Sequence, residues 1–71
     1  MTWTLVIFDD WQALYNSDGE RVLESDRLEA GEIVEAMGGK VRFASQIFDL
    51  EVAHEGTPED LDEFPDYAFT Q

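Results

Sequence analysis

Residues 2–8, with the sequence TWTLVIF, are apolar on both faces of an extended chain. Alternate side chains of a β-strand point to opposite sides, and here large apolar residues occupy both. A strand of this kind is covered on both faces, in the middle of a sheet or beneath a helix. The segment therefore predicts a sheet in which this strand is an interior member.

A β-hairpin is predicted after this strand. Asp9 and Asp10 interrupt the apolar pattern, which residues 11–15 resume. Residues 16–19, Asn-Ser-Asp-Gly, form a strong turn sequence, because Asp-Gly is a favoured hairpin pair. Residues 20–24 then return as a short strand.

An amphipathic helix should follow the hairpin, with Ser25 or Asp26 as its N-cap. Apolar residues recur at the spacing of one helical face, which we expect to pack onto the sheet; they are Ala30, Ile33, Val34 and Met37. Gly38 and Gly39 end the helix, one of them in the left-handed conformation.

Two more strands are expected. Residues 40–44 alternate, with Val41 and Phe43 facing inward and Lys40 and Arg42 outward. The apolar phase then slips, so a bulge or turn near residues 46–49 should precede a strand at 48–53.

The C-terminal part is expected to begin a short helix at Thr57 and Pro58 and to end that turn at Pro65. Residues 66–71 should be loosely held, with docking of Tyr67 and Phe69 as the alternative. Together these elements predict one α+β domain over residues 1–71. It has a small antiparallel sheet of four to five strands, one helix packed across a face and a short C-terminal helical turn.

Charge excludes several function classes. The 71 residues contain 17 Asp and Glu but four Lys and Arg, for a net charge of -13. Direct binding to nucleic acid or an anionic membrane is opposed electrostatically. There is no apolar run near the ~18 residues that cross a membrane, so the cytoplasm is the expected compartment.

Catalytic and metal-binding signals are weak. Residues 6–10 resemble the first strand of haloacid-dehalogenase-type phosphatases, but Trp11 stands where their second carboxylate is needed. His54 is the only histidine and there is no cysteine, so a zinc site lacks its usual ligands. We expect no enzymatic activity, no catalytic residue, no metal and no cofactor.

The distribution of charge is more informative. All four bases lie between Arg21 and Arg42, whereas residues 43–71 contain eight acids and no base. A surface of one sign steers a partner of the opposite sign. The predicted partner-binding residues are Asp49, Glu51, Glu55, Glu59, Asp60, Asp62 and Glu63, with Glu29, Glu32 and Glu35 on the expected helix.

The expected spacing of these acids suits a nucleic-acid-binding groove. On a strand, Asp49 and Glu51 would project to one side about 6.6–6.8 Å apart. On a helix, Glu29 and Glu32, or Glu32 and Glu35, have Cβ atoms about 5–6 Å apart. Duplex DNA carries one charge per ~1.7 Å of its axis, so such rows could occupy phosphate subsites.

In size and charge the chain resembles the DNA-mimic inhibitors of bacteriophages and mobile elements, such as anti-CRISPR and anti-restriction proteins. The similarity covers composition alone, since that class shares no motif. It implies a basic DNA- or RNA-binding partner, such as a CRISPR effector, a restriction enzyme or a repair enzyme, whose groove is blocked. For a phage protein, the compartment is the cytoplasm of the host cell.

Two alternatives remain open. Proteins of extreme halophiles are similarly acidic and poor in lysine, and Lys40 is the only lysine here. The second alternative is a protein-interaction module. Its acidic and aromatic tail, residues 61–69, would bind a partner's groove rather than cover the chain's own sheet. A homodimer is a further expectation if the large rings of Trp3, Trp11 and Phe48 exceed what so small a core can hold.

Overall fold

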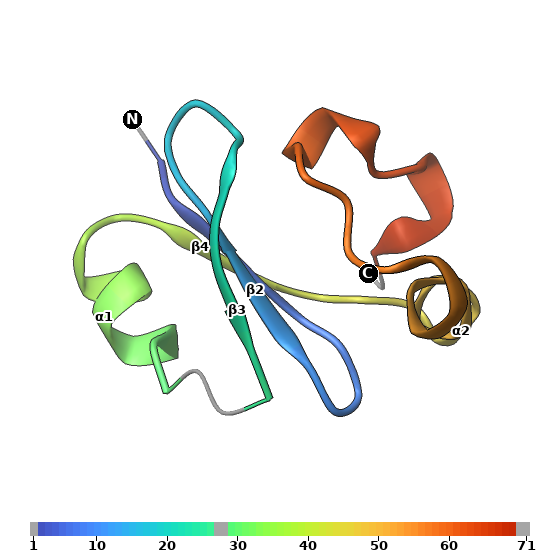
Figure 1. Ribbon diagram of the computed structural model, residues 1–71. Coiled ribbons are helices and arrows are strands. Elements are labelled where there is room, and N and C mark those ends of the chain that lie inside the picture. Colours follow the sequence, from blue (N-terminus) through green and yellow to red (C-terminus); the bar gives the residue numbers. More distant parts are fainter. Residues whose placement is uncertain (1, 27–28, 70–71) are drawn as a thin grey trace.

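The computed structural model describes residues 2–26 and 29–69. Its centre is a four-stranded sheet with the order β3-β2-β1-β4 (Figure 1). The strands are β1 (Thr4–Ile7), β2 (Gln12–Tyr15), β3 (Arg21–Ser25) and β4 (Lys40–Phe43). The α+β class is confirmed, and the first strand is interior, between β2 and β4.

The predicted hairpin is present, with β2 antiparallel to both β1 and β3. Its turn depends on Asn16, whose Oδ1 accepts hydrogen bonds from the backbone N–H of Asp18 at 2.9 Å and of Glu20 at 3.0 Å. Gly19 has a φ of 84°, the left-handed region that glycine adopts without strain.

The sheet is mixed rather than antiparallel, because β4 pairs with β1 in parallel. The prediction overlooked the connection between β3 and β4. β3 runs in the same direction as β1, and the helical crossover after β3 returns the chain to the end of the sheet at which β3 begins. The strand after the helix therefore runs parallel to β1.

Helix α1 (Gly31–Ala36) is shorter than predicted. Ser25 ends β3 instead of capping the helix, and the N-cap is Ala30, which makes no side-chain capping bond. Only Val34 of the expected apolar stripe is buried, whereas Ile33 and Met37 are exposed. The helix is so short that only one of its turns faces the sheet. The predicted end is correct, with Gly38 at a φ of 81°.

Helix α2 (Gln46–Glu55) replaces the predicted strand at 48–53. Ser45 is its N-cap, and the hydroxyl accepts a hydrogen bond from the backbone N–H of Phe48 at 3.3 Å. Phe48 and Val52, four residues apart, both face the core. The slip in apolar phase is therefore a change of period from strand to helix, not a bulge.

The C-terminal segment forms two 3-10 turns, η1 (Leu61–Glu63) and η2 (Asp66–Ala68), rather than a helix from Thr57. A helix there would need the carbonyls of Thr57 and Pro58 for its own ladder. Those carbonyls instead accept hydrogen bonds from side chains of the sheet.

This segment is docked as far as residue 69, contrary to the expectation of a loose end. Ala68 is buried, and Phe69 forms a β-bridge with Ala44. Leu61, Phe64 and Phe69 pack against the core, so they cover the chain's own sheet. Residues 70 and 71 lie outside the described part.

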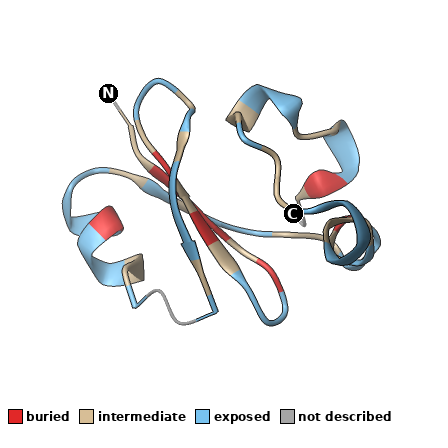
Figure 2. Ribbon diagram, in the orientation of Figure 1, coloured by how far each residue is buried: buried red, intermediate tan, exposed pale blue. Residues whose placement is uncertain are grey.

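The two faces of the sheet are covered differently. Helix α1 lies on one side, and α2 with the C-terminal segment lies on the other (Figure 1). The main core is on the α2 side, and its buried members are Val6, Phe8, Ala13, Tyr15, Phe48 and Ala68 (Figure 2). Phe64 joins them, with ring centroids 5.4 Å from Tyr15 and 5.1 Å from Phe48.

The two sides of β4 also differ from the expectation. Val41 is half-buried but Phe43 is exposed. Arg42 does not simply face solvent, since its guanidinium lies 4.0 Å from the ring centre of Phe69. Phe69 of the docked segment therefore contacts this face of β4, although Arg42 and Lys40 are themselves exposed. Within the described residues, no helix has the length and apolar character needed to span a membrane.

A candidate acidic protein-binding surface

A groove lies between α2 and residues 56–65, with a volume of about 450 Å³. Four carboxylates line it, from Glu51, Glu55, Glu59 and Glu63, and no Lys or Arg of the described residues does. The side chains of Phe48, Val52 and the prolines supply its apolar lining. We call this the acidic groove and define it by the four glutamates.

Helix α2 forms one wall of the acidic groove. Glu51 and Glu55 are one helical turn apart, which separates their Cβ atoms by about 5–6 Å. The Tyr67 hydroxyl lies 2.7 Å from both carboxylate oxygens of Glu51, to which it donates. This hydrogen bond raises the pKa of Tyr67 above its ordinary value and holds Glu51 in position.

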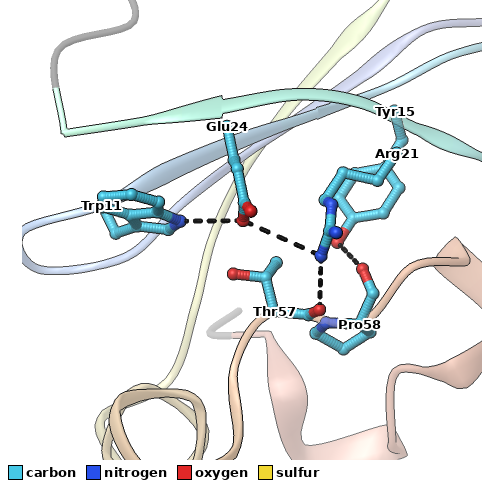
Figure 3. Close-up of polar contacts among 6 residues, drawn as sticks. All are labelled: Trp11, Tyr15, Arg21, Glu24, Thr57 and Pro58. Carbon is cyan, nitrogen blue, oxygen red and sulfur yellow. Dashed lines mark hydrogen bonds and ion pairs between the residues drawn. The ribbon is translucent and has the colours of Figure 1, made fainter.

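Contacts with the sheet hold the other wall, around residues 57–59. Arg21 Nη1 donates to the Thr57 carbonyl at 2.6 Å, and the Tyr15 hydroxyl donates to the Pro58 carbonyl at 2.6 Å (Figure 3). The backbone N–H of Arg21 also donates to the Glu59 carbonyl at 2.8 Å. The carboxylates on this wall are therefore carried by an anchored backbone.

The pKa of Tyr15 reflects the burial and the charges behind this wall. Burial raises the pKa of its hydroxyl well above the ordinary value, and the nearby carboxylates of Glu24, Glu63 and Asp60 raise it further, while Arg21 opposes them. A tyrosine in this setting stays neutral and keeps donating to Pro58.

Among the described residues no Lys or Arg lines the acidic groove itself, although Arg21 shares a neighbouring hollow with Glu59. Arg21 forms the one ion pair seen among the described residues, with Glu24 at 3.8 Å. Arg42 stacks on Phe69, and Lys40 is exposed on β4. Arg27 lies outside the described residues. Two of the four bases thus hold the C-terminal segment against the sheet.

Asp49 does not join Glu51, contrary to the prediction that the two project to one side. On a helix, residues two positions apart point about 200° away from each other. Asp49 Oδ1 accepts a hydrogen bond from the backbone N–H of Asp9 at 3.1 Å, so it faces the β1–β2 turn.

Asp60 and Asp62 lie beside the acidic groove. Asp60 forms a β-bridge with Glu20 and lines a small hollow with Glu20, Arg21 and Glu59. Asp62 lines a hollow next to the hairpin turn of residues 16–19.

The three glutamates near α1 are separate from the acidic groove. Glu32 and Glu35 are exposed on α1, across the sheet from α2 (Figure 1). Glu29 precedes the helix, so the predicted helical spacing to Glu32 does not apply. The predicted acids therefore occupy two regions on opposite sides of the sheet.

A second hollow, of about 410 Å³, was not predicted. Trp11 lines it together with three carboxylates, Asp10, Glu24 and Asp49. The indole Nε1 donates to Glu24 Oε2 at 3.2 Å (Figure 3). Trp11 is 37% exposed and so lies at the rim rather than in the core.

Within residues 2–26 and 29–69, no three His, Asp or Glu side chains are grouped so that they could hold a metal ion.

Comparisons with protein-family models, curated proteins and solved structures gave no match.

Proposed function

We propose that the protein is a non-enzymatic inhibitor that presents a DNA-like anionic surface to a basic nucleic-acid-binding protein and blocks its groove. The observation that carries this proposal is the acidic groove. Four glutamates from two segments line one hollow, and within residues 2–26 and 29–69 neither Lys nor Arg lines it with them.

Preorganisation of the four carboxylates supports this proposal. A phosphate-binding surface uses Lys and Arg to neutralise closely spaced phosphates, and the DNA then releases its condensed counterions. Carboxylates on an anchored helix and an anchored loop offer such a surface negative charge with little ordering cost. The large negative charge also accelerates encounter with a basic partner.

A second candidate is adaptation to salt, and a specific observation favours it. Glu32 and Glu35 are exposed on the far side of the sheet from the acidic groove, so the surplus charge is not confined to one face. Under this reading the acids serve hydration and have no partner. A tail-mediated interaction module has less support, because residues 61–69 are packed on the core.

Displacement of DNA tests the proposal. A labelled duplex is bound to each of three purified proteins, a CRISPR effector, a restriction endonuclease and a DNA-repair glycosylase, and fluorescence anisotropy follows its release. We expect release of the duplex from at least one of them at 50 mM salt. Retention of the duplex by all three at 50 mM salt would contradict the proposal.

A further inference from the structure

The solvent-facing side of α2 carries no Asp, Glu, Lys or Arg, although the chain has a net charge of -13. Ile47 and Leu50 are 64% and 65% exposed, the highest values among large apolar residues of the described part. Ala53 and His54 are also exposed and continue the same side of the helix. We call these four residues the α2 outer stripe.

The core does not require this stripe. Phe48 and Val52 already supply the side of α2 that faces the sheet. On a helix, Leu50 points about 160° away from Phe48, so it does not contribute to the same contact. Leucine and isoleucine at these positions therefore add exposed apolar surface, which folding alone does not explain.

The stripe continues into a hollow of about 510 Å³ at the end of the sheet. Leu50 lines this hollow with Ile7, Phe8 and Phe43, and the carboxylates of Asp9 and Asp49 lie beside them. An apolar side chain of a partner could enter here, with a cation next to it.

Acids flank the stripe on both sides. Asp49 follows one edge of α2, and Glu51 and Glu55 follow the other, where they enter the acidic groove. A second copy of the chain would bring the same acidic flanks together, which is unfavourable. A basic partner would find the opposite charge on both flanks, so the charge pattern favours it over self-association.

We propose that the α2 outer stripe is the apolar centre of the interface, and that it receives an apolar strip of the basic partner while Lys and Arg beside that strip meet the flanking acids. This inference rests on the proposed function and deepens it. Charge complementarity governs encounter and specificity, whereas affinity depends on a few well-packed apolar anchors.

Two synthetic peptides test the inference. One is a 14-residue amphipathic helix with leucines on one face and lysines on the other, and the second is an oligolysine with the same number of charges. Titration calorimetry at 100 mM salt should show at least tenfold tighter binding of the amphipathic peptide.

The double variant Ile47→Gln/Leu50→Gln should remove this preference, since it deletes the apolar surface and keeps both helix propensity and net charge. The matched control is Val22→Thr/Leu23→Thr, which alters two adjacent apolar residues of β3 that are 47% and 51% exposed. The control should keep the preference, and circular dichroism confirms that both variants fold.

Each other outcome overturns a distinct claim. Equal binding of the two peptides by the unaltered protein would overturn the apolar centre and leave the proposed function standing. Failure of both peptides to bind would count against both. Sedimentation showing a dimer that Ile47→Gln/Leu50→Gln dissociates would assign the stripe to a second copy of the chain instead.

Discussion

At the scale of single residues, Tyr15 connects the core to the acidic groove. Its ring packs against Phe64 at 5.4 Å in the core, while its hydroxyl holds the Pro58 carbonyl at 2.6 Å. Burial of the hydroxyl makes its neutral form strongly preferred in the folded chain. One side chain thus couples sheet stability to the position of the groove wall.

Replacing Tyr15 with Phe should lower the free energy of unfolding by about 1–3 kcal/mol at pH 7, because the Pro58 carbonyl loses its donor. Since folding raises the pKa of Tyr15, its contribution is fully present below the unfolded pKa of about 10 and declines as pH rises above it. Urea denaturation between pH 7 and pH 11 measures both effects.

The unaltered protein should lose stability above pH 10 more steeply than the Tyr15→Phe variant. The same measurement on Tyr67→Phe gives the contribution of an exposed hydroxyl, which donates to the Glu51 carboxylate and whose pKa is also raised. Parallel curves with an offset would contradict the raised pKa of Tyr15, and coincident curves would show that the buried hydroxyl does not stabilise the fold.

At the scale of elements, the position of α2 is the main structural finding that sequence patterns did not predict. The apolar residues from Ile47 to Val52 fit a strand after a phase slip, whereas on a helix they fall on two opposite sides, with Phe48 and Val52 toward the core and Ile47 and Leu50 exposed. Ser45 as N-cap and Gly56 as terminator favour the helix, and these two signals should have decided the question. The hairpin turn and the end of α1 were predictable because their chemistry is local.

Replacing Ser45 with Ala should destabilise the fold by about 1–2 kcal/mol. The change removes the cap on Phe48 N and also the hydrogen bond that the hydroxyl donates to the Tyr67 carbonyl at 2.7 Å. Ser17→Ala in the exposed hairpin turn is the matched control and should be nearly neutral. Equal urea midpoints for the two variants would refute the role of Ser45 in starting α2.

The candidate site was predictable in part. The four glutamates of the acidic groove were all among the predicted acids, because a run without Lys or Arg is visible in the sequence. Their convergence was not, since it depends on residues 57–63 folding back beside α2. The contacts that achieve this, from Tyr15 and Arg21, join positions 36 or more residues apart.

At the scale of the whole molecule, the charge of -13 must be tolerated by a small core. Salt at 0.1 M already reduces the Debye length to about 10 Å, so modest screening relieves most long-range repulsion. We expect the melting temperature to rise over the first few tenths molar KCl and then to level off. Melting in dilute buffer with continued stabilisation into molar KCl would instead support adaptation to salt.

The central claim is that a basic protein recognises the acidic groove rather than the overall charge. Two triple variants with the same change in net charge distinguish recognition of the groove from recognition of the overall charge. One is Glu55→Lys/Glu59→Lys/Glu63→Lys in the groove, and the other is Glu29→Lys/Glu32→Lys/Glu35→Lys at α1. All six side chains are exposed, so both variants should fold. The measurement is DNA displacement from whichever of the three proteins responds to the unaltered chain. We expect the potency of DNA displacement to fall at least a hundredfold in the groove variant and less than tenfold in the α1 variant. Equal losses of potency in the two variants would show that overall charge, not the acidic groove, is recognised.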